Sequence, residues 1–170
     1  MIALIRDSLW KQFGASIDML HNAIDRWPEQ KWNTTRRPLY VGYHTIVFLD
    51  YYLTIPPNGF SPALPYTTND NWKGIDGAVD DMIPTDNYTQ KQLLHYLRAC
   101  REKCHTLITS LDEQTINERW IDESGTKNYS VLEILLYNMR HVQHHAAQLN
   151  MMLRKEINEA PKWVARAEEG

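Results

Sequence analysis

Three of the seven histidines of this 170-residue chain lie within five positions, in the segment RHVQHHAAQL that covers residues 140–149. His141 and His145 are four residues apart, so on a helix their side chains project from neighbouring turns of one face. Two imidazoles at this spacing can reach one metal ion at about 2.0–2.1 Å per Zn–N bond, as the two histidines of an H-E-x-x-H helix do. The segment therefore predicts a metal site.

The apolar stripe of the same helix indicates which histidines face the core. The stripe is centred near Leu135, Val142 and Leu153. At about 100° per residue, His145 lies about 80° and His141 about 120° from its centre, on one flank and beside Asn138. His144 lies about 180° away, so it points to solvent or to a partner. His141 and His145 are therefore the candidate pair.

A catalytic zinc-type site usually has a third protein ligand, and the segment GYHTIVFLDYY offers one in His44. This histidine has apolar and aromatic neighbours at helical spacing. An imidazole in such surroundings must find a partner or incur a desolvation cost of about 1–3 kcal/mol. A metal shared with the histidine pair would be such a partner. Asp50, six residues later, is the second-ranked ligand or an outer acceptor for an imidazole N–H.

These residues also have structural interpretations. A histidine pair at helical spacing can be hydrogen-bonded at the rim of a core, and His44 can be an ordinary core histidine. Cys100 and Cys104 are four residues apart and could bind zinc, but buried free thiols of a reducing compartment are the preferred interpretation. The other histidines have no second ligand-type residue at matching spacing on an inward face: His21, His95 and His105.

Composition indicates a globular protein and excludes some partners. The chain is 43% hydrophobic and 23% charged, with a net charge of −3 and a pI near 6.1. A length of 170 residues favours one domain over 1–170. Because there is no basic excess, we expect neither nucleic acid nor a membrane as a partner. The sequence shows neither a signal-peptide core nor a membrane span, so we expect a cytoplasmic protein.

Four segments with helical periodicity predict an all-α fold, a four-helix bundle: residues 2–26, 38–54, 90–111 and 131–156. Thr89 with Gln92, and Ser130 with Glu133, have the spacing of a capping box at the start of the third and fourth helices. Pro38 is placed in the first turn of the second helix, where proline is tolerated.

A long crossover, residues 55–88, joins the second and third helices and holds five of the eight prolines. These prolines exclude a missed long helix. Connections of this length in a compact domain are usually functional. We expect the crossover to gate a pocket, with Trp72 as a side chain that could cap it.

A histidine early in the second of four helices, followed by HVQHHAAQL in the fourth, resembles the DinB/YfiT-like family of metalloenzymes. The similarity covers nearly the whole chain in helix order and loop proportions. The family's three metal-binding histidines fall on His44, His141 and His145, and His144 matches the first residue of its frequent HH pair, of which only the second is a ligand. Where many members have Arg-Gly-Gln after the last histidine, this chain has Ala-Ala-Gln at 146–148.

The resemblance implies a homodimeric bundle that binds a divalent metal ion, commonly nickel or zinc, with positions open to water or substrate. Some relatives are thiol-dependent transferases that use bacillithiol or mycothiol, and one branch isomerises maleylpyruvate with mycothiol. The resemblance thus implies a small-molecule substrate and a low-molecular-weight thiol as a second cofactor.

The leading hypothesis is a metal-dependent enzyme that activates a thiol or water for transfer to, or hydrolysis of, a small molecule. Thiol transfer fits better than peptide hydrolysis, because no glutamate follows His141 as in H-E-x-x-H. The alternatives are a non-catalytic, metal-stabilised protein that binds a small ligand, and a stress-associated dimer whose histidines only make hydrogen bonds.

Overall fold

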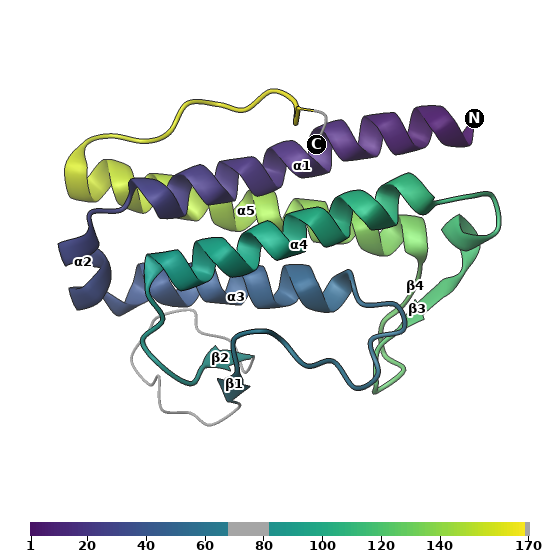
Figure 1. Cartoon of the computed structure of the whole chain (residues 1–170), viewed down its shortest axis with the longest axis horizontal. Helices are drawn as coiled ribbons and strands as arrows, with labels where there is room; N and C mark the ends of the chain where they lie inside the picture. The colour runs from purple at the N-terminus through teal and green to yellow at the C-terminus, as the bar shows by residue number, and fades with distance from the viewer. Residues whose placement is uncertain (68–81, 169–170) are drawn as a thin grey trace.

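Four long helices form the bundle that the periodicity predicted, which confirms the all-α fold. The computed structural model of the chain describes residues 1–67 and 82–168. The long helices are α1 (Ile2–Arg26), α3 (Arg36–Tyr52), α4 (Gln90–Ser110) and α5 (Val131–Ile157). Helices α1 and α3 each pack against both α4 and α5 (Figure 1). Apolar side chains from all four helices meet in one buried core.

The predicted capping residues begin α4 and α5. Thr89 Oγ1 accepts a hydrogen bond from the Gln92 backbone N–H at 3.3 Å, and Gln92 Oε1 accepts one from the Thr89 N–H at 2.9 Å, so this capping box is complete. Ser130 Oγ accepts from the Glu133 N–H at 3.2 Å. Each bond satisfies a backbone N–H that has no partner within its own helix.

The structure also contains short elements that periodicity did not predict. They are α2 (Glu29–Thr34), a 3-10 helix (Thr115–Asn117), and the antiparallel pairs β1 (Tyr66–Thr67) with β2 (Ile83–Pro84) and β3 (Arg119–Ile121) with β4 (Asn128–Ser130). The turn between β3 and β4 contains Gly125, whose φ of 72° favours glycine. Helix α3 begins two residues earlier than expected, with Pro38 still in its first turn, and ends at Tyr52.

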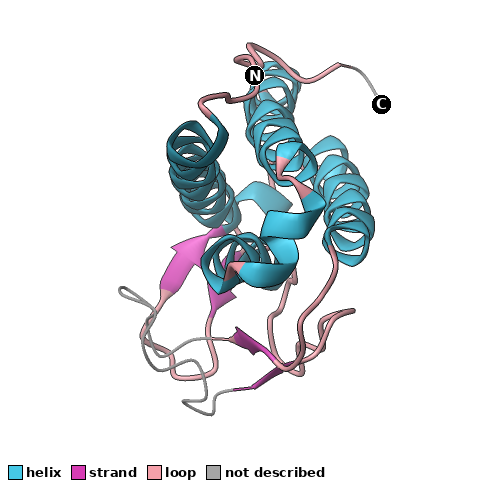
Figure 2. Cartoon of the chain, turned by 90° about the vertical axis from the view of Figure 1, so that its left-hand side faces the viewer, coloured by secondary structure: helices cyan, strands magenta, loops and turns pink. Residues whose placement is uncertain are grey.

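The long crossover is required by the direction of the helices it joins. Helices α3 and α4 run the same way, so the chain must return along the bundle between them (Figure 1). The described parts of the crossover carry β1 and β2, and β2 packs against α3 below the bundle (Figure 2). The Tyr43 hydroxyl donates to the Leu64 carbonyl at 2.8 Å, which ties the crossover to α3. Trp72 lies outside the described residues, and its role as a cap stays a prediction.

The segment after α5 folds back along α1. Asn158 ends α5 in the left-handed conformation, and residues 158–168 then run beside α1 (Figure 1). The Ala167 N–H donates to the Lys11 carbonyl at 2.9 Å. Gly14 makes this approach possible, because a Cβ there would lie only 2.5 Å from the Cβ of Ala167. The tail is therefore packed against a helix face that accepts only glycine without displacement.

No helix among the described residues combines the length and apolar character that a membrane span requires.

Candidate metal centre

The structure brings the three predicted histidines together between α3 and α5. His44 Nε2 lies 3.2 Å from His141 Nε2, and His141 Nε2 lies 3.1 Å from His145 Nε2. One nitrogen from each ring lies within 4.8 Å of the other two. His44 is buried, with 7% of its surface exposed, and the other two are half-buried. We call these three residues the histidine triad.

Packing between α3 and α5 sets the register that makes the rings meet. Asn138 is fully buried one turn before His141, and its side-chain amide donates to the Leu49 carbonyl of α3 at 3.0 Å. The Phe48 ring contacts one histidine of each helix. Its centroid lies 4.8 Å from that of His44 on α3 and 5.9 Å from that of His141 on α5. Both contacts restrict sliding of one helix along the other, so they hold the triad in place.

Burial keeps the triad neutral. Desolvation, with the charge of His145, lowers the pKa of His44 to about 3. Desolvation and the neighbouring histidines lower the pKa of His141 to about 2, and burial also lowers the pKa of His145. Neutral imidazole, which has one nitrogen lone pair, is the form that binds a metal ion.

The spacing of the nitrogens fits a single divalent ion. With bonds of about 2.0–2.1 Å, two nitrogen ligands lie about 3.4 Å apart in a tetrahedral site and about 2.9 Å apart when adjacent in an octahedral one. The observed separations of 3.2 and 3.1 Å fall between these values. Three neutral imidazoles suit zinc, nickel and other late first-row metals. The three histidines could therefore hold one divalent ion.

The Gln148 side chain contacts the ring nitrogen of His145 that faces away from the triad. Gln148 Oε1 lies 2.7 Å from His145 Nδ1, and a carbonyl oxygen only accepts, so Nδ1 carries the proton. The lone pair is then on Nε2, which faces the triad. The Nδ1 atoms of His44 and His141 are buried and have no hydrogen-bond partner within the described residues.

Asp50 does not join the triad. Its Oδ1 lies 2.6 Å from Lys103 Nζ, and its Oδ2 accepts from the Tyr96 hydroxyl at 2.6 Å. Lys103 also donates to Thr54 Oγ1 at 2.7 Å. Side chains of α4 therefore occupy both carboxylate oxygens. Asp50, the second-ranked ligand expected from the sequence, instead belongs to a network that links α3 to α4.

The other candidates lie outside the triad. His144 is exposed, in agreement with the helical wheel. Cys100 and Cys104 are free and buried, and burial raises the pKa of both thiols. Because thiolate is the form that binds metal, these sulfurs are poor ligands. The ring of His105 packs against Trp10 with centroids 4.4 Å apart, and no metal-ligand group of the described residues contains it.

A comparison with protein families agrees with this geometry. The model of the DinB superfamily matches residues 12–149. The chain belongs to the DinB superfamily. The part that matches the DinB superfamily contains all three triad histidines and ends before the tail that covers α1. No curated protein and no solved structure matches the chain.

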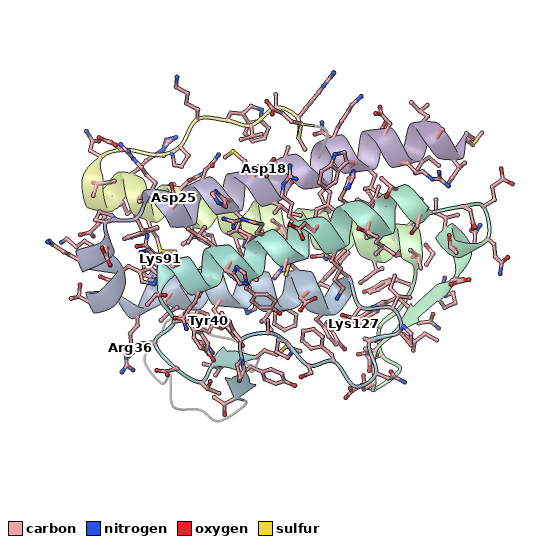
Figure 3. The ribbon with its side chains drawn as sticks, in the orientation of Figure 1. Asp18, Asp25, Arg36, Tyr40, Lys91 and Lys127 are labelled. Atoms are coloured by element: carbon pink, nitrogen blue, oxygen red, sulfur yellow. The ribbon has the colours of Figure 1, made fainter. Side chains whose placement is uncertain are left out.

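Two residues that interact with the triad, by a hydrogen bond or by charge, were not identified as functional from the sequence. Gln148 could have been found, because it lies three residues after His145 and therefore on the same helix face. Lys127 could not have been found, because it lies in the turn of the β3–β4 hairpin, which was not predicted. Its Nζ lies 5.6 Å from the centroid of the Tyr52 ring, and its charge contributes to the lowered pKa of His141. Figure 3 shows Lys127 near the end of α3.

Proposed function

We propose that His44, His141 and His145 hold one divalent metal ion, nickel or zinc, and that the protein is a metal-dependent enzyme acting on a small molecule. The observation that carries this proposal is the convergence of three Nε2 atoms, two pairs of which lie 3.2 and 3.1 Å apart. Membership of the DinB superfamily also supports it.

A divalent ion in this place would act as a Lewis acid that lowers the pKa of a water or thiol at an open position. The protein supplies a positive charge near the anion so formed, because the charge of Lys127 contributes to the lowered pKa of His141. No carboxylate is among the causes of the triad's pKa shifts within the described residues. The three ligands are neutral, so a thiolate or hydroxide would not be repelled by an acidic neighbour.

The aromatic surroundings favour a small organic substrate. The rings of Phe48 and Tyr52 lie 5.9 and 6.1 Å from that of His141, and Tyr137 packs edge-on against Tyr52 at 5.2 Å. These side chains form an apolar wall on one side of the triad, which lowers the local polarity and strengthens electrostatic interactions there. Transfer of a thiol to an electrophilic small molecule is the reaction that we propose.

The second candidate is a metal-stabilised binding protein without turnover. It is favoured by the lack of a carboxylate near the triad in the described residues, because a general base would normally occupy that place. Consumption of an electrophile such as 1-chloro-2,4-dinitrobenzene, dependent on a thiol and abolished by a chelator, would exclude this candidate.

Elemental analysis of protein purified without a histidine tag tests the proposal. We expect about one metal ion per chain and its loss in His145→Ala. His95→Ala is the matched control, because His95 is exposed on α4 and away from the triad. Full retention of metal in His145→Ala, or a metal-free wild-type protein after growth in nickel and zinc, would contradict the assignment.

A further inference from the structure

We infer that Gln148 is a positioning residue that selects the metal-binding tautomer of His145, with His144 holding the Gln148 amide in the required orientation. The inference rests on the proposed function, since it concerns how the triad is prepared for an ion. It also assigns a role to the exposed histidine that the helical wheel placed outside the site.

Both ends of the Gln148 amide have partners. Its oxygen accepts from His145 Nδ1 at 2.7 Å, and its nitrogen donates to His144 Nε2 at 3.1 Å. An amide NH₂ only donates and an amide oxygen only accepts, so the two contacts are linked. When His144 presents a lone pair at Nε2, the Gln148 oxygen must face His145, and the proton of His145 is placed on Nδ1.

The reversed amide would have the opposite effect on the triad. Its NH₂ would face His145 Nδ1, which would then carry the lone pair. The proton of the neutral ring would move to Nε2, the atom that lies 3.1 Å from His141 Nε2. A protonated Nε2 has no lone pair for a metal ion. The orientation of one amide therefore determines whether His145 can act as a ligand.

Tautomer selection is concentrated at this residue. The Nδ1 atoms of His44 and His141 make no hydrogen bond within the described part of the chain, whereas that of His145 does. Outer partners of this type usually change metal affinity by 10- to 100-fold. Gln148 is itself exposed, so its replacement should leave folding almost unchanged.

The experiment compares wild-type protein with Gln148→Met, which keeps the side-chain length without hydrogen bonds, and Gln148→Glu, whose two oxygens only accept. Gln143→Met, on the same helix, is the matched control. Long-range ¹⁵N–¹H NMR of the metal-free protein assigns the tautomer of His145, and competition with a chelator measures affinity for Zn²⁺.

We expect Nδ1 to be protonated in wild-type and in Gln148→Glu, and both tautomers to be populated in Gln148→Met. Gln148→Met should bind Zn²⁺ about 10- to 100-fold more weakly, with a melting temperature within about 2 °C of wild-type. Gln143→Met should match wild-type. An unchanged tautomer or an unchanged affinity in Gln148→Met would overturn the inference while leaving the metal site intact. Wild-type protein that binds neither Zn²⁺ nor Ni²⁺ would refute the proposed function, and the NMR result would still test the role of Gln148.

Discussion

Asp50 Oδ1 and Lys103 Nζ form an ion pair 2.6 Å long that joins α3 to α4. Asp50 lies six residues after His44 in the chain. The Asp50 side chain is 14% exposed, so its charge is largely removed from water. Tyr96 occupies the second carboxylate oxygen. The arrangement identifies Asp50 as a structural link between helices, and this role can be separated experimentally from metal binding.

Replacing Asp50 by Asn should therefore lower stability without loss of metal. The change removes the ion pair and leaves Lys103 without its carboxylate, so we expect the free energy of unfolding to fall by about 1–3 kcal/mol. Urea unfolding measures this difference, and elemental analysis measures the metal content. Glu102→Gln, at an exposed position of α4, should change neither quantity. If the folded Asp50→Asn variant lost its metal, Asp50 would be a metal ligand and the structural role would be wrong.

The lowered pKa values of the triad predict an acid-sensitive metal-free protein. The pKa of His44 is lowered to about 3 and that of His141 to about 2, from 6.5, so the unfolded chain binds protons below pH 6.5 that the folded chain does not. Stability must then decrease as the pH falls through this range, by about 1.4 kcal/mol per pH unit for each histidine. Urea unfolding between pH 6 and 5 tests the slope, and a smaller slope in His141→Phe identifies its origin. Equal slopes in both proteins would show that His141 titrates normally.

The contact between Gly14 and Ala167 predicts that Gly14→Ala releases the tail. A Cβ at residue 14 would lie 2.5 Å from the Ala167 Cβ, whereas alanine is otherwise favourable in a helix. We expect trypsin to cleave at Lys162 and Arg166 faster than in wild-type, with little change in helicity by circular dichroism. Ala167→Gly in the Gly14→Ala background should restore slow cleavage, because it removes the clashing atom. Unchanged cleavage in Gly14→Ala would mean that the tail does not pack closely there.

Lys127 should strengthen the binding of anions at the proposed metal centre. Its positive charge acts on His141, so Lys127→Met should weaken azide binding to the Co²⁺-loaded protein by about threefold to tenfold. Titration followed by visible absorption measures the affinity. Lys127→Arg keeps the charge and should bind azide like wild-type. Lys91→Met, at an exposed position of α4, controls for general loss of charge, and equal azide affinities for all four proteins would exclude a role for Lys127.

The long helices could be predicted because each shows helical periodicity, and the capping spacing of α4 and α5 agrees with it. Thr89 and Ser130 cap α4 and α5 as their spacing indicated. The six-residue helix α2 and the two-stranded pairs were not predictable in this way, because they are too short to show a hydrophobic period. Their positions depend on packing against the bundle, which a single sequence does not display.

The triad was predictable because its members satisfy local rules. His141 and His145 share a helix face, and His44 lies in an apolar helix that gives a histidine few other partners. The role of Asp50 could not be predicted, because its partners Lys103 and Tyr96 come from another helix. Contacts between helices depend on the crossing geometry and register of the bundle, and spacing within one segment carries no information about them.

His44 and His141 lie next to each other in space but 97 positions apart in the chain. An ion held by both would close a loop of that length, much as a disulfide does. In the unfolded chain, closing a loop of this span would cost about 5 kcal/mol of conformational entropy at 25 °C, so the ion would bind the folded chain much more tightly. Removal of the ion would then loosen the whole bundle and not only the neighbourhood of the histidines. Metal occupancy would then contribute to the stability of the whole bundle.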